Sequence, residues 1–123
     1  MEFKKFKAAT VQTSPDFLNV EKTVDKAISF IKEAASNQAK LIAFPEVFIS
    51  GYPYWNWIMT PVQGSKWYEE LYKNSVDISG AEIKKLCLAA KENDMHIVMG
   101  INERGKSYGE IYNTNLIIDN KGV

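Results

Sequence analysis

A short apolar run that ends in a proline and a carboxylate constrains the fold more than any other feature. We interpret residues 41–44 as a buried β-strand that stops at Pro45, and Glu46 follows directly in apolar and aromatic company. In open α/β sheets, ligands bind just beyond the carboxyl ends of the strands. A carboxylate at this place is therefore a candidate reactive group.

Two interpretations of Glu46 stay open at this stage. Burial of the carboxylate among neighbouring aromatic side chains would make it a better proton acceptor, as a general base requires. Alternatively, Glu46 only caps a backbone turn after the proline. Perturbed carboxylates occur in structural as well as functional places, so position and composition alone do not decide. The aromatic neighbours are Phe44, Phe48, Tyr52, Tyr54, Trp55 and Trp57.

Hydrophobic periodicity predicts strand, helix and strand in the first third of the chain. Residues 6–12 form the first expected strand, and residues 20–36 carry an apolar stripe at helical spacing, with Asn19 as the N-cap. The strand at residues 41–44 is then expected to run parallel to the first. An irregular, aromatic stretch over residues 47–64 follows, and such long loops in compact domains are usually functional.

The rest of the chain continues the alternation of helices and strands. A helix over residues 65–74 is expected to point Trp67 and Leu71 inward, and Ser79 with Glu82 matches a capping box at the start of the next helix. Strands are expected at residues 96–102 and 111–118. This order indicates an α/β layer architecture.

Composition excludes several classes of function. The 123 residues suit one small domain, and fifteen basic residues balance fifteen acidic ones, so no global charge attracts nucleic acid or a membrane surface. No apolar run is long enough to span a bilayer, and no signal peptide follows the first lysines. A single cysteine permits no internal disulfide, which fits a cytoplasmic protein. We expect no metal and no cofactor, because metal-ligand spacing and a Gly-rich phosphate loop are both missing from the sequence.

Several motifs together resemble the nitrilase superfamily of carbon–nitrogen hydrolases. Phe44-Pro45-Glu46 followed by Gly51-Tyr52-Pro53-Tyr54-Trp55 is similar to the sequence around the catalytic glutamate of that family, and the aromatic continuation is closest to the true nitrilase branch. Further similarities lie at residues 8–12, 74–75, 98–104 and 112–114. The resemblance implies the N-terminal part of a four-layer αββα sandwich.

The resemblance also implies the chemistry. Enzymes of this family use a glutamate, a lysine and a cysteine, and only the glutamate matches here, as the proton acceptor Glu46. The family lysine and cysteine lie further along than Val123. Residues 119–122, Asp-Asn-Lys-Gly, are typical of a turn between adjacent strands, and the chain stops one residue later. We therefore expect residues 1–123 to be a partial domain, truncated before the lysine and the cysteine.

The resemblance places Tyr52 beside the reacting centre and suggests that Trp57 shapes the space for the substrate. The alternative is that both aromatic side chains simply fill the core. Cys87 lies on the apolar face of its helix and is expected to be an unreactive, buried thiol. His96 is expected to be a packed or surface residue. Glu103, Asn113 and Thr114 are expected to be structural, with Glu103 pairing with Arg104 or a backbone donor and the other two bonding to neighbouring backbone.

The expected function is that of the N-terminal part of a nitrilase, which converts organic nitriles to carboxylic acids and ammonia. An amidase or carbamoylase of the same superfamily is the first alternative, and a non-catalytic α/β module is the second. The resemblance implies a homo-oligomer for the full-length protein. Nucleic-acid and membrane partners are not expected.

Overall fold

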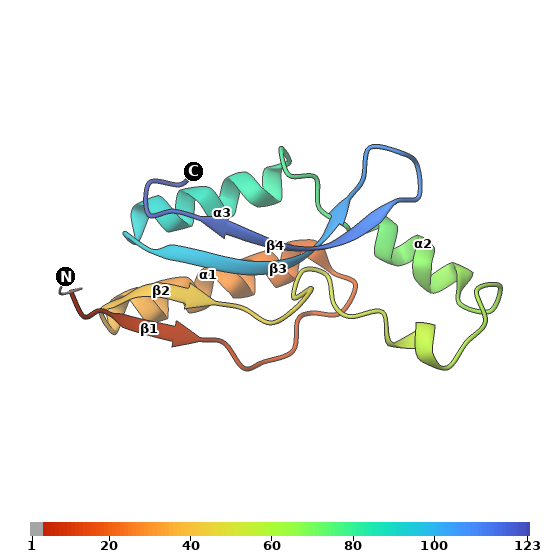
Figure 1. The fold of residues 1–123 in the computed structure, drawn as a ribbon, viewed down its shortest axis with the longest axis horizontal. Helices are drawn as coiled ribbons and strands as arrows, with labels where there is room; N and C mark the ends of the chain where they lie inside the picture. Colours follow the sequence, from red (N-terminus) through yellow and green to blue (C-terminus); the bar gives the residue numbers. More distant parts are fainter. Residues whose placement is uncertain (1–3) are drawn as a thin grey trace.

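Parallel strands at one edge and an antiparallel hairpin at the other form the sheet of this computed structural model, which describes residues 4–123 (Figure 1). The strands are β1 (Lys7–Thr10), β2 (Ala39–Ala43), β3 (His96–Arg104) and β4 (Ile111–Ile118), in that spatial order. Strands β1, β2 and β3 run parallel, and β4 returns antiparallel to β3. The expected α/β class and the parallel pairing of the first two strands are confirmed.

Helices α1 (Val20–Ser36) and α3 (Ala81–Glu92) lie in contact with each other over one face of the sheet. Side chains alternate between the two faces of a strand. Ile97, Met99 and Ile101 of β3 therefore share the helix-covered face, and all three are fully buried. This face holds the hydrophobic core.

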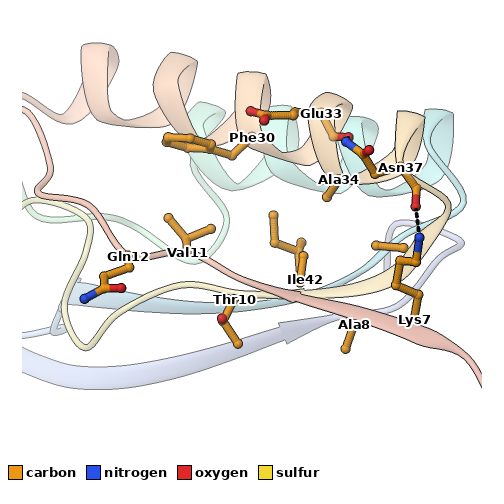
Figure 2. A pocket seen from close by; sticks show the side chains of 12 residues that line it. Lys7, Ala8, Thr10, Val11, Gln12, Phe30, Glu33, Ala34, Asn37 and Ile42 are labelled. Carbon is orange, nitrogen blue, oxygen red and sulfur yellow. Dashed lines mark hydrogen bonds between the residues drawn. The ribbon is translucent and has the colours of Figure 1, made fainter.

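The other face of the sheet carries no helix in the described part of the chain. Figure 2 shows the division near β1, where Val11 and Ile42 point toward α1 while Ala8 and Thr10 point away from it. A cavity of about 300 Å³ lies on the helix side of this edge. On the uncovered face, Ile117 of β4 is 71% exposed. We call this uncovered side the open face.

The start of α1 agrees with the prediction. The helix has the expected bounds, and the Asn19 Oδ1 atom accepts a hydrogen bond from the backbone N–H of Lys22 at 3.0 Å. The predicted N-cap is therefore confirmed. Such a cap typically contributes about 1 kcal/mol to helix stability.

The capping box predicted at Ser79 is wrong. The Asp77 Oδ1 atom accepts hydrogen bonds from both the backbone N–H and the hydroxyl of Ser79, each at 2.7 Å, so the serine is already engaged in a local turn. Helix α3 begins instead at Ala81 with Gly80 as its N-cap and no side-chain cap. The same two hydrogen bonds, the hydroxyl first, lower the pKa of the Asp77 carboxyl below its ordinary value.

Helix α2 (Ser65–Lys73) lies away from the main core. Leu71 is buried as predicted, but Trp67 is 44% exposed, so its predicted inward orientation is wrong. Its ring stacks on Trp55 instead, with ring centroids 6.0 Å apart. Aromatic contact with the preceding loop therefore replaces burial in the core.

The segment after β2 continues alongside β3 before it leaves the sheet. The backbone N–H groups of Phe44 and Ile49 donate to β3 carbonyls at 2.9 and 3.1 Å. Ile49 forms a parallel bridge to Ile101, and the chain returns to the same strand at Val76, which bridges to Glu103. The intervening aromatic segment thus leaves and rejoins the sheet at neighbouring positions of one strand.

This path passes so close to β3 that a side chain at Gly100 would collide with it. A Cβ atom built on Gly100 would lie 2.5 Å from the backbone nitrogen of Val47 and 2.9 Å from the carbonyl carbon of Glu46. Real Cβ atoms do not approach other atoms so closely, and these atoms are backbone, which cannot rotate away. The position therefore requires glycine.

We predict that Gly100→Ala lowers the free energy of unfolding by about 3 kcal/mol or more, at the upper end of overpacking costs, because the segment must move away from β3. Urea denaturation measures the change. Gly109→Ala is the control: in the described part of the chain, no atom beyond its two chain neighbours lies within 4 Å of the added Cβ, and only its φ of +84° costs about 1 kcal/mol. Equal losses in the two variants would contradict the close approach.

Candidate active site

Glu46 lies just past the carboxyl end of β2, in the segment that runs alongside β3 and packs closely against Gly100. This is the edge of the sheet at which the sequence predicted it. Because β1, β2 and β3 run parallel, their carboxyl ends meet at the same edge. The fold therefore presents Glu46 where α/β proteins commonly bind ligands.

The backbone beside Glu46 is strained and firmly held. Val47 has a φ of +40°, which is rare for a β-branched residue and costs about 1–3 kcal/mol. The buried amide of Asn102 donates to the carbonyls of Ile49 at 3.3 Å and Gly51 at 2.9 Å, which fixes the segment from the sheet side. Strain of this kind is retained where the surroundings enforce it, and it clusters at functional sites.

The Glu46 carboxylate has one side-chain partner among the described residues. The Nδ2 atom of Asn113, on β4, donates to Glu46 Oε1 at 2.7 Å. The structure records no backbone donor to this carboxylate in the same part of the chain, so the interpretation of Glu46 as a turn cap is wrong. Instead, a side chain from a distant strand holds the carboxylate in place.

The expected burial of Glu46 among aromatic side chains is also wrong for the described residues, because Glu46 is exposed. Phe44 and Phe48 turn into the core beneath the helices, with ring centroids 5.3 Å apart. Trp55 packs against Phe17 and Trp67. Phe44, Trp55 and Trp57 do not line the cavity at Glu46, and the carboxylate stays exposed.

Glu46 nevertheless lines a cavity of about 240 Å³, together with Tyr52, Tyr54, Phe48 and Gly51. The rings of Tyr52 and Tyr54 pack with centroids 4.9 Å apart. The other lining residues, from the segment between β1 and α1 and from the two positions beside Glu46, are uncharged. The structure therefore brings together Glu46 and Tyr52, two of the three residues selected from the sequence.

Trp57, the third, lies elsewhere. It ends the short 3₁₀ helix η1 (Tyr54–Trp57), is 75% exposed and does not line the cavity with Glu46. The alternative that Trp57 fills the core is therefore wrong.

His96 is a surface residue, as expected, and Cys87 is less buried than expected. Cys87 lies on α3, half-buried against the core, and desolvation followed by the Asp119 charge raises the pKa of its thiol. His96 is exposed at the start of β3, the opposite end of the strand from the Glu46 edge, with Nδ1 3.3 Å from the carbonyl oxygen of Lys40. Neither residue lines the cavity.

The expected partners of Glu103, Asn113 and Thr114 are wrong. Glu103 accepts a hydrogen bond from the Thr114 hydroxyl at 2.6 Å, and Arg104 instead binds carbonyls at the end of α2, including that of Tyr72 at 3.2 Å. Asn113 bonds to the Glu46 side chain and not to backbone. Asn113 faces Asn102 across the hairpin on the open face, a pairing that the structure shows and the sequence does not.

Among residues 4–123, no group of three or more His, Cys, Asp or Glu side chains is arranged to hold a metal ion. Within the same range, no helix has the length and apolarity needed to cross a membrane.

A carboxylate at the carboxyl edge of a parallel sheet, beside a strained loop and a cavity, is an arrangement typical of α/β enzymes. The sequence specifies the family: the carbon–nitrogen hydrolase model matches residues 7–123, so the chain belongs to this family.

The chain is similar to curated nitrilases along nearly its whole length. It is 42% identical to a nitrilase of Bacillus sp. (strain OxB-1) over 98% of this chain and 34% of that protein. It is 42% identical to an aliphatic nitrilase of Rhodococcus rhodochrous, over 95% and 32% of the two chains. A cyanide hydratase of Leptosphaeria maculans is 40% identical over 84% and 29%. The chain thus spans about a third of the length of these relatives.

Solved structures share the fold. An amidase from Nesterenkonia sp. superimposes with a TM-score of 0.65 at 19% identity, over 94% of this chain and 38% of that one. The NitFhit protein of C. elegans also gives a TM-score of 0.65, at 17% identity over 94% and 25%. The expected fold class is confirmed: the described residues form one helix layer and one sheet of the kind found in part of these proteins.

We predict that Cys87, the single cysteine of residues 1–123, reacts slowly with iodoacetamide at pH 7.5. Its raised pKa keeps the thiol protonated, and the thiolate is the reactive form. Alkylation followed by mass spectrometry should be about 10-fold slower than in the same chain unfolded in urea, and the difference should shrink as pH rises. Equal rates at pH 7.5 would contradict this environment.

Proposed function

We propose that residues 1–123 are the N-terminal part of a nitrilase that hydrolyses organic nitriles to carboxylic acids and ammonia, with Glu46 as the proton acceptor. The observation that carries the proposal is the Glu46 carboxylate, held by Asn113 at the edge of a cavity beyond the end of β2. The 42% identity to nitrilases supports a nitrile as the substrate.

The proposed chemistry needs a thiol and a cation that match no residue of this chain. The thiol attacks the nitrile carbon and forms a thioimidate, while Glu46 accepts the thiol proton. One water molecule then adds and ammonia leaves, which gives a thioester, and a second water releases the acid and regenerates the thiol. A lysine stabilises the negative charge that develops during attack. Glu46 also activates each water molecule.

Tyr52 and Trp57 are the proposed substrate-binding residues. Tyr52 lines the cavity with Glu46, which supports a direct contact with the nitrile. Trp57 is exposed in this chain, and its contact with the substrate is proposed from the family resemblance. Assembly into a homo-oligomer and a cytoplasmic location remain predictions of the family resemblance.

A cyanide hydratase is the second candidate, because relatives with that name are 36–40% identical to this chain. The amidase alternative has support from fold similarity at 19% identity or less, which does not discriminate between substrates. Products separate the three activities: a nitrilase releases ammonia and an acid from a nitrile, a cyanide hydratase converts hydrogen cyanide to formamide without ammonia, and an amidase turns over amides. Turnover of amides without nitriles by the full-length enzyme would refute the proposal.

We predict that Glu46→Gln lowers kcat for nitrile hydrolysis by the full-length enzyme about 10²–10⁴-fold, because glutamine keeps the shape of the side chain but cannot accept the proton. Ammonia release measures the effect, and an unchanged circular dichroism spectrum shows that the fold is retained. Glu103→Gln is the matched control, since that carboxylate bonds to Thr114 on the helix-covered side of the sheet. Unchanged turnover by the Glu46 variant would rule out its proposed role as the proton acceptor.

We also predict that purified residues 1–123 release no ammonia from nitriles, because the nucleophile and the cation are not among them. The full-length enzyme, assayed in parallel at the same molar concentration, is the positive control. Measurable turnover by residues 1–123 would show that the chain contains a nucleophile of its own.

A further inference from the structure

Two asparagines that face each other across the β3–β4 hairpin hold the Glu46 segment in different ways. Asn102 and Asn113 are cross-strand partners on the open face. Asn102 is buried and binds the backbone of the segment at Ile49 and Gly51. Asn113 is exposed, and among residues 4–123 its side chain binds the Glu46 carboxylate alone, at 2.7 Å. The pair therefore separates anchoring of the backbone from orientation of the side chain.

We propose that Asn113 is the positioning residue of the active site, which fixes the rotamer of Glu46 so that one carboxylate oxygen is left to take the proton. This inference rests on the proposed function of Glu46. An ionised carboxylate only accepts hydrogen bonds, so the amide must present its Nδ2 group to it. Because Oε1 already accepts a hydrogen bond from that donor and Oε2 has no recorded partner among the described residues, Oε2 is the oxygen more accessible to the reacting thiol or water.

The position of Asn113 makes it a rigid reference point. Continuous antiparallel pairing from Ile97↔Ile118 to Arg104↔Ile111 fixes β4 on β3 on both sides of Asn113. Gly100 of the same hairpin has no side chain and so allows the Glu46 backbone to lie directly against β3. The donor and the carboxylate are therefore attached to one rigid unit, and a long, otherwise exposed glutamate side chain gains a defined direction.

No other described group is placed to do this. The remaining residues that line the cavity carry no charge, and the titratable ones among them are the phenols Tyr52 and Tyr54. The structure records no hydrogen bond from either phenol to Glu46 within the described part of the chain. Without Asn113 the glutamate would sample several rotamers, and only a fraction of them would direct an oxygen to the reacting atoms.

The backbone of the segment does not depend on Asn113, which makes the proposal testable. Asn102, Gly100 and the bridge between Ile49 and Ile101 hold the segment to β3. Removal of the exposed Asn113 amide should therefore leave the fold intact and affect turnover only.

The experiment compares Asn113→Ala and Asn113→Asp in the full-length enzyme by steady-state kinetics with a nitrile. The aspartate variant keeps the size of the side chain but replaces the donor with a second acceptor. The free energy of a hydrogen bond to a charged group corresponds to a change of about 10–100-fold in rate. We therefore expect kcat to fall by that factor in the alanine variant and by at least as much in the aspartate variant. KM should change less than about 3-fold, because the loss affects proton transfer and not substrate binding.

Asn115→Ala and Asn115→Asp are the matched controls. Asn115 lies two residues along β4 on the same face and makes no recorded side-chain hydrogen bond within the described residues, so the Asp control adds the same charge nearby. Both should keep kcat within about 3-fold of the unmodified enzyme. Thermal unfolding of all four variants tests whether the fold is retained.

The outcomes separate this proposal from the proposed function. Wild-type kcat in Asn113→Ala or in Asn113→Asp, with Glu46→Gln inactive, would overturn the positioning role alone. A fully active Glu46→Gln variant would overturn the function on which it rests. Equal losses at positions 113 and 115, or a loss in KM rather than kcat, would also overturn the positioning role, since neither depends on the bond to Glu46.

Discussion

The contact between the backbone of residues 45–47 and strand β3 supports everything else at this site. Gly100 leaves room for it, and hydrogen bonds from Phe44 and Ile49 to the strand maintain it on either side. As a result, the first residue with reactive chemistry after β2 rests on the most deeply buried strand of the sheet. The rigidity of the hydrophobic core is thereby passed to Glu46 through main-chain atoms, which have little freedom to relax.

This support explains why an exposed carboxylate still has a defined environment. On the open face, Glu46 would ordinarily behave as a solvated side chain. Asn113 binds its carboxylate, Asn102 holds the backbone that follows it, Val47 is strained beside it, and Tyr52 lines the same cavity. These features restrict the direction of the Glu46 side chain but leave its carboxylate exposed to water. Desolvation of the carboxylate would require protein that covers the open face.

Local signals in the sequence predicted the local structure well. The apolar stripe and Asn19 gave α1 its bounds because helix periodicity and capping act within a few residues. Ser79 failed as a cap because Asp77, two residues away, competes for its hydroxyl. The place of Glu46 followed from the end of a strand, but its surroundings did not, since the direction of each aromatic ring depends on tertiary packing. The bond from Asn113 spans 67 residues, and no pattern in the sequence encodes that distance.

The aromatic segment between Ile49 and Val76 leaves β3 at the bridge from Ile49 to Ile101. It returns to the same strand at the bridge from Val76 to Glu103. The two ends of this segment therefore lie at neighbouring positions of the same strand. The residues between them can increase or decrease in number, or change in composition, at a small entropic cost and without altering the sheet. Under the proposed function, specificity for different substrate side groups can then diverge in this segment while the end of β2 that carries Glu46 stays constant. One framework of this kind can serve a family of enzymes that share a reaction and differ in their substrates.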